Sequence, residues 1–152
     1  MICENKGNNM QLYSLCVEGF RKHIKTKITF SDSTFLIGEN NVGKSSILYA
    51  LDYLLGATNK ISPEEYYAFE NNGERKSPVE NIVFTAEFRK IPEEASSWRG
   101  FNGRVLKYIP EENDPLDTGL KFIYRKTYPR GGTVKIETLE NPKVLKNDLK
   151  IA

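Results

Sequence analysis

The 152-residue sequence lacks several features that would assign it to a protein class at once. No uninterrupted apolar run approaches the roughly 20 residues that a membrane-spanning helix needs, and no apolar segment follows a basic start, which argues against a secretory signal. Only Cys3 and Cys16 are present, without metal-ligand spacing, so we expect reduced thiols in a cytoplasmic protein. The formal net charge of +2 gives no argument for or against nucleic acid.

What is present suffices for one ordinary domain with a hydrophobic core. Hydrophobic residues make up 39% and charged residues 28% of the chain, a balance typical of folded globular proteins rather than disordered or membrane ones. Residues 1–10 are interpreted as a disordered leader, and Met10 is an alternative start. Residues 11–152 are then expected to form the folded part.

Alternating apolar and polar residues predict two strands near the N-terminus. Residues 11–18 form the first, which Gly19 ends, and residues 23–30 alternate more regularly and form the second. The two are expected to pair antiparallel across the turn between them. Residues 34–37, "TFLI", are nearly all apolar, which predicts a short strand covered on both faces.

After residue 43, apolar residues recur at helical spacing, and a second set of predicted strands follows. The spacing predicts a helix from about Lys44 to Leu55, with Gly56 at its C-terminal cap. The remaining expected elements are a short helix over 63–69, a strand over 79–90, a helical turn or two within 91–101, a loop over 108–119, a strand over 120–129, a tight turn at 130–132 and a returning strand over 133–140.

The stretch "GENNVGKS" matches the phosphate-binding P-loop pattern in Gly38, Gly43, Lys44 and Ser45. A predicted strand precedes it and a predicted helix follows it, which is the context that the pattern requires. Glycine lets the loop curl so that backbone N–H groups point inward, and the helix directs its positive dipole end at the anion. A glycine-rich strand-to-helix turn without a ligand is the alternative.

Each side chain of this stretch has a predicted role. Lys44 supplies a charge for the β- and γ-phosphates, the Ser45 hydroxyl is placed to bind Mg²⁺, and Ser46 would lie near the α-phosphate. The pattern indicates a nucleoside triphosphate and does not separate ATP from GTP. The predicted phosphate-binding residues are Gly38, Asn40, Asn41, Val42, Gly43, Lys44, Ser45 and Ser46.

The wider sequence from Leu12 to Gly56 resembles the amino-terminal segment of ABC-type ATPases of the SMC and RecF kind. The shared features are an opening strand, an "FRK" turn, a second strand and then "IGENNVGKSSILYAL". The "GEN" opening and the double serine look most like the OLD (overcoming lysogenization defect) family, which joins such an ATPase to a Toprim nuclease domain. From Gly56 to about Glu140 the resemblance is looser.

The resemblance implies a fold, a cofactor and partners. The implied fold is α/β, a P-loop NTPase forming the N-terminal part of an ABC-type (RecF/SMC-like) ATPase head with an antiparallel β subdomain. The implied ligands are ATP and Mg²⁺, with Ser45 on the metal, and Arg21 near the phosphates and ribose. It further implies a homo-oligomer through head-to-tail pairing of ATPase heads, with DNA as substrate and no membrane partner.

Several motifs of the resembling family are missing from residues 11–152. The sequence has no "LSGGQ"-type signature, no Walker B acid pair, no switch histidine and no Toprim acidic cluster; His23 is the only histidine. We therefore interpret the chain as the ATP-binding N-terminal portion of an OLD-like ATP-dependent DNA endonuclease, with no catalytic residue of its own. The alternatives are a RecF/SMC-like DNA-repair ATPase fragment and a non-catalytic nucleotide-binding interaction module.

Three weaker features have both a functional and a structural interpretation. Arg21 is either the phosphate-side residue that the resemblance implies or part of a solvated hairpin, and Phe20 faces the adenine or anchors the core. Glu65, before Tyr66, occupies the link where the resembling ATPases sense metal and γ-phosphate, or it favours a helix dipole. The basic and aromatic residues of 121–135 either contact DNA or line an exposed hairpin.

Overall fold

The computed structural model describes residues 10–30 and 42–139, and for residues 42–45 the backbone alone. One α-helix, two 3₁₀ helices and eight strands occur in these ranges. In chain order they are β1 (Gln11–Phe20), β2 (His23–Thr29), α1 (Val42–Leu55), η1 (Pro63–Glu65), β3 (Phe69–Asn71), β4 (Glu74–Lys76), β5 (Asn81–Arg89), η2 (Glu93–Ser97), β6 (Leu106–Lys107), β7 (Leu120–Pro129) and β8 (Lys135–Thr138).

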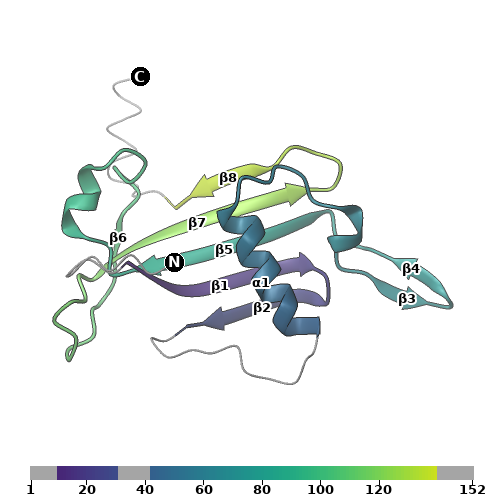
Figure 1. Cartoon of the computed structure of the whole chain (residues 1–152), viewed down its shortest axis with the longest axis horizontal. Coiled ribbons are helices and arrows are strands. Elements are labelled where there is room, and N and C mark those ends of the chain that lie inside the picture. The colour runs from purple at the N-terminus through teal and green to yellow at the C-terminus, as the bar shows by residue number, and fades with distance from the viewer. Residues whose placement is uncertain (1–9, 31–41, 140–152) are drawn as a thin grey trace. The chain divides into compact units, whose positions relative to one another are not determined.

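Six of the strands form one sheet, and β3 and β4 form a separate hairpin. The order in the sheet is β2-β1-β5-β7-β6, and β8 also pairs with β7. Neighbouring arrows from β2 to β8 alternate in direction, so this part of the fold is an antiparallel sheet (Figure 1). The predicted antiparallel pairing of the first two strands is confirmed, with Leu15 opposite Ile28 and Cys16 opposite Lys27.

The described residues divide into two compact units. Unit 1 contains residues 10–13, 87–124 and 138–139, and unit 2 contains residues 14–30, 42–86 and 125–137. The strands β1, β5 and β7 contribute residues to both units. The phosphate-binding pattern runs into α1, which belongs to unit 2.

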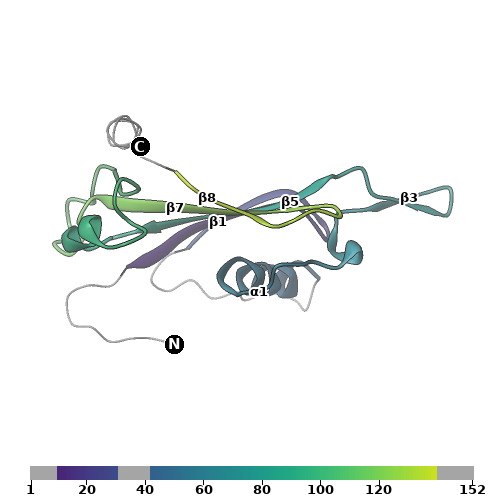
Figure 2. The same cartoon turned by 90° about the horizontal axis from the view of Figure 1, so that it is seen from above.

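The core of unit 2 forms where α1 lies against one face of its strands (Figure 2). Strand residues buried on this face alternate, as the period of a strand requires, and helix residues recur at helical spacing. The rings of Phe20, Tyr53, Phe84 and Tyr128 pack mostly edge to face, with centroids 5.2–6.2 Å apart. The buried apolar residues include Leu15, Val17, Ile47, Ala50, Leu54, Ile82, Phe84 and Ala86.

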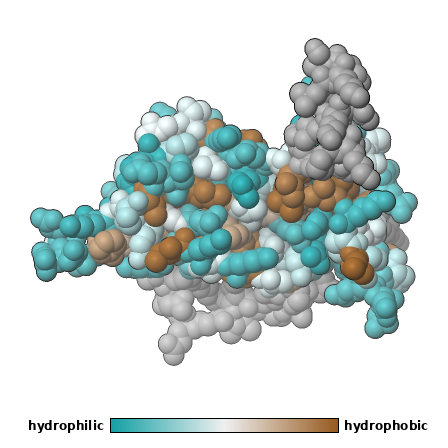
Figure 3. Space-filling model, turned by 180° about the vertical axis from the view of Figure 1, so that it is seen from behind, coloured by the Kyte–Doolittle hydropathy of each residue, from teal (hydrophilic) through white to brown (hydrophobic). Residues whose placement is uncertain are grey.

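The opposite face of the strands is mixed in polarity, and Figure 3 shows polar and apolar residues side by side on this side of the molecule. The register with β2 places Lys27 opposite Cys16 and Lys25 opposite Glu18, on the parity that α1 does not cover. Cys16 is a half-buried free cysteine. Burial raises the pKa of Cys16, and Glu18 raises it further, against the opposing effect of Lys25, Lys27 and Arg125.

Two local predictions need correction. The helix expected over 63–69 stops at Glu65, and Phe69 already belongs to β3. Tertiary hydrogen bonds end it, because Tyr67 N donates to Gly19 O over 2.7 Å instead of continuing a helix.

Gly56 follows α1 as predicted, yet its φ is not positive; a Cβ there would meet Asp52 O at 2.6 Å. The strand expected over 34–37 lies outside the described residues.

Candidate nucleotide-binding site

The phosphate-binding pattern leads directly into α1. Gly38, Asn40 and Asn41 lie outside the described residues, whereas Val42 to Ser45 form the first turn of the helix backbone. The first N–H groups of a helix have no partner within it, and the first turn of α1 contains no acidic residue. This helix end therefore offers donors to an anion without a competing carboxylate on its own first turn.

The side of α1 that follows this turn is anchored in the core. Ser46 has no exposed surface, and Ile47, Ala50 and Leu54 are at most 3% exposed. The helix axis is therefore fixed against the strands of unit 2. Contact of Ser46 with an α-phosphate stays a prediction.

Arg21, in the β1–β2 turn, forms a two-bond ion pair with Glu65 at the end of η1. Its Nε donates to Glu65 Oε2 over 2.6 Å, and its Nη2 donates to Glu65 Oε1 over 3.3 Å. Both side chains are partly buried, at 23% and 19% exposed. The structure thus joins two residues that the sequence analysis singled out separately, 44 positions apart.

The ring of Tyr49 supports the same guanidinium group. The Arg21 guanidinium carbon lies 4.3 Å from the ring centroid of Tyr49 on α1 and 5.2 Å from that of Phe20. Phe20 itself is fully buried, so its role is that of a core anchor rather than an adenine platform. Sequence reasoning missed Tyr49, although its position one helical turn after Ser45 was available as a signal.

Backbone hydrogen bonds hold the β1–β2 turn against the segment around η1. Arg21 N donates to Glu65 O over 2.7 Å, and Phe20 forms an isolated antiparallel bridge with Tyr66. Arg21 has a φ of 53°, in the left-handed region that non-glycine residues rarely adopt. The surrounding bonds therefore determine this conformation, which places the Arg21 side chain beside α1.

The other end of α1 is held by two side chains of β7. The Lys126 ammonium donates to Tyr53 O over 2.8 Å and to Gly56 O over 3.0 Å, while the Tyr128 hydroxyl donates to Thr58 O over 2.6 Å. These carbonyls include groups that a helix C-terminus leaves without partners. A lysine that is 1% exposed thus caps the helix that begins at the phosphate-binding pattern.

A comparison with protein-family models finds the AAA ATPase domain, which matches residues 10–141. The chain belongs to the AAA ATPase domain family. Membership indicates a P-loop NTPase and an ATP-binding function, in agreement with the pattern at the start of α1. No curated protein matches the chain. Among the residues that the structure describes, no helix is long and apolar enough to cross a membrane.

Two residues of the segment 121–135, Lys126 and Tyr128, cannot form part of a DNA-contacting surface, so that interpretation is wrong for them. Lys126 and Tyr128 are 1% and 2% exposed, because their alternation places them on the face that packs against α1. Burial lowers the pKa of Lys126. Both side chains instead donate hydrogen bonds to carbonyl groups at the C-terminal end of α1. They are two residues apart in β7 and so lie on the same face of the strand, which the sequence alone could have indicated.

The other basic residues of this segment mostly have partners within the domain. Lys121 pairs with Glu87 and Lys135 with Glu137, each at 3.8 Å. Arg130 donates to Val79 O over 2.9 Å. Arg125 is exposed and donates to Thr85 Oγ1 over 3.3 Å, so its side chain remains on the surface.

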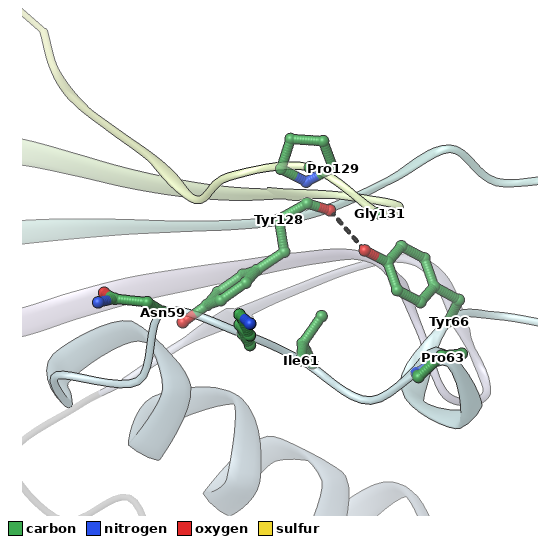
Figure 4. Close-up of a pocket in the computed structure, with 9 residues that line it drawn as sticks. Asn59, Ile61, Pro63, Tyr66, Tyr128, Pro129 and Gly131 are labelled. Atoms are coloured by element: carbon green, nitrogen blue, oxygen red, sulfur yellow. Dashed lines mark hydrogen bonds between the residues drawn. The ribbon is translucent and has the colours of Figure 1, made fainter.

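A small cavity of about 260 Å³ lies beside the link between α1 and η1. Figure 4 shows the Tyr66 side chain reaching toward Tyr128. The Tyr66 hydroxyl donates a hydrogen bond to the backbone oxygen of Tyr128 over 3.0 Å. Ligand pockets usually measure about 300–1,000 Å³, so this cavity is small for a nucleotide. Among the described residues, those that line it are Asn59, Lys60, Ile61, Pro63, Tyr66, Tyr128, Pro129, Gly131 and Gly132, and Ser46 of the phosphate-binding pattern is not one of them.

Proposed function

We propose that the chain is the ATP-binding N-terminal portion of an OLD-like ATP-dependent DNA endonuclease. The observation that carries ATP binding is the AAA ATPase domain match over residues 10–141, with α1 beginning inside "GENNVGKS". The antiparallel sheet beside α1 is consistent with the β subdomain of an ABC-type head. The OLD-like part of the proposal rests on the "GEN" opening and the double serine.

The proposed site uses this chain's own residues to hold Mg-ATP. The loop from Gly38 to Val42 and the first turn of α1 supply backbone N–H donors to the phosphates. Lys44 neutralises charge on the β- and γ-phosphates, and the Ser45 hydroxyl holds Mg²⁺, which in turn bridges phosphate oxygens. Arg21 lies on the turn beside the same helix and contributes further N–H donors.

Two parts of the proposal reach beyond nucleotide binding. The OLD-like resemblance supports DNA as substrate and pairing of two ATPase heads in a homo-oligomer. The coding sequence after Ala152 tests the nuclease assignment. A signature motif, a Walker B acid pair and a Toprim acidic cluster would support it, whereas long heptad segments would favour a RecF/SMC-like ATPase instead.

The substitution Lys44→Ala tests ATP binding. It removes the ammonium group that faces the phosphates, so retention of a fluorescent ATP analogue by the full chain should be abolished. Lys76→Ala is the matched control, because Lys76 is an exposed lysine of the β3–β4 hairpin and should leave retention unchanged. Equal retention by Lys44→Ala and wild type would refute the site.

A further inference from the structure

The Arg21–Glu65 pair leaves one edge of the guanidinium group available. The two hydrogen bonds to Glu65 use Nε and Nη2, and no hydrogen bond joins Nη1 to another described residue. An arginine has donors along both edges of its planar group, so one edge can hold a carboxylate while the other meets a second anion. Glu65 therefore orients this arginine without consuming all its donors.

The plane of the guanidinium group is fixed from a second direction by α1. Tyr49 presents its ring to Arg21 at 4.3 Å and is itself 51% exposed. Tyr49 lies one helical turn, about 6 Å of axial rise, beyond Ser45. The guanidinium group is therefore held beside the middle of α1, the helix that begins at the phosphate-binding pattern.

The backbone on both sides of the pair is also held in place. Arg21 N donates to Glu65 O, and Tyr67 N donates to Gly19 O, each over 2.7 Å. An ordinary surface ion pair contributes little because two mobile side chains must be ordered to form it. Here the turn and η1 are already joined, so the pair forms between groups that are pre-organised.

The ion pair also removes a repulsion between Glu65 and a bound triphosphate. An isolated carboxylate beside a phosphate-binding helix end would repel a triphosphate, whereas the paired Glu65 is neutralised by Arg21. We propose that Glu65 is a positioning residue, which holds the Arg21 guanidinium on the Tyr49 ring with its remaining edge toward the bound triphosphate. This inference rests on the proposed ATP binding and assigns Glu65 no contact with the nucleotide or the metal.

The first test compares two neighbouring glutamates in the full chain. Glu65→Ala should weaken binding of a fluorescent ATP analogue about tenfold, the loss expected for one charge-assisted hydrogen bond. Arg21→Ala should lose about as much, and the double variant no more, because both remove the same interaction. Glu64→Ala is the matched control: its backbone oxygen accepts a bond from Arg75, which the substitution keeps.

The second test distinguishes a role of Glu65 in orienting the Arg21 guanidinium group from a contribution of the ion pair to folding stability alone. The exchange Arg21→Glu with Glu65→Arg keeps an ion pair but moves the guanidinium group to position 65. The melting temperature should recover toward that of wild type while analogue affinity stays low. Recovery of affinity in this variant would overturn the inference.

Three further outcomes identify which part of the inference has failed. If Lys44→Ala loses the analogue but Glu65→Ala matches Glu64→Ala, ATP binding stands and the positioning role is wrong. If Glu65→Ala lowers affinity with Mg²⁺ present but not with EDTA, Glu65 acts on the metal, which also overturns it. If the wild-type chain does not bind the analogue, the proposed function itself fails.

Discussion

Tyr108 in unit 1 shows how one side chain joins several backbone segments. Its hydroxyl donates to Asp117 and accepts a bond from Lys90 N, and its ring centroid lies 4.4 Å from the Arg89 guanidinium carbon. Burial, together with the hydrogen bond to Asp117, raises the pKa of Tyr108 to about 12. Burial alone would raise the pKa of Asp117, but hydrogen bonds from Tyr108, Gly119 and Glu111 lower it.

Tyr108 should therefore make stability depend on alkaline pH. The unfolded chain loses the phenol proton near pH 10, whereas the folded chain keeps it until about pH 12, so folded stability falls across this window. Tyr108→Phe should be less stable than wild type at pH 8, and the difference in urea midpoint should shrink between pH 10 and 12. A constant difference between Tyr108→Phe and wild type across this pH range would contradict the assignment.

At the scale of elements, α1 is held at its middle and at its C-terminal end by side chains distant in sequence. Arg21 contacts Tyr49, the eighth of its 14 residues, and Lys126 and Tyr128 bind the carbonyl group of Tyr53 near its end. The ammonium group also carries the sign of charge that a helix C-terminus favours. A helix that presents N–H groups to a phosphate must be fixed in position, and these contacts supply the constraint.

Lys126→Met should show the strength of the C-terminal contact. Methionine retains most of the apolar stem but leaves Tyr53 O and Gly56 O without the ammonium donor, which should cost about 2–3 kcal/mol in the free energy of unfolding. Urea denaturation of both proteins measures this difference in the free energy of unfolding. Lys121→Met on the same strand removes a partly exposed ion pair and should cost less than about 1 kcal/mol. Equal losses in the two variants would exclude the capping role.

For the whole molecule, the features that bear on nucleotide binding belong to unit 2. This holds for α1, for the Arg21–Glu65 pair and for Lys126. A ligand that binds only the folded state stabilises it by mass action, in proportion to the logarithm of its concentration. Nucleotide binding at α1 should thus be visible in the unfolding of the chain.

Mg-ATP should raise the melting temperature of the main unfolding transition. At a ligand concentration about 100 times the dissociation constant, the expected rise for a chain of this size is about 5–10 °C. Differential scanning fluorimetry measures it across a concentration series. Lys44→Ala should show no rise; a similar rise in both proteins would place binding elsewhere than the first turn of α1.

Strong periodicity made several elements predictable. Strand β7 has the bounds expected from its sequence, and β1 and β2 differ by one or two residues at their ends. Strands β3, β4 and β6 were missed because two or three residues are too few to show a period of two. Their pairing depends on partners that local sequence does not specify.

The sequence by itself determined the phosphate-binding pattern, the helix that follows it and the alternation of the longer strands, because each arises from neighbouring residues. Only the tertiary structure decided that Arg21 pairs with Glu65, that Lys126 caps α1 and that the predicted helix after Pro63 stops at Glu65. Each of these depends on hydrogen bonds across 44 to 73 positions of sequence, where local periodicity carries no information.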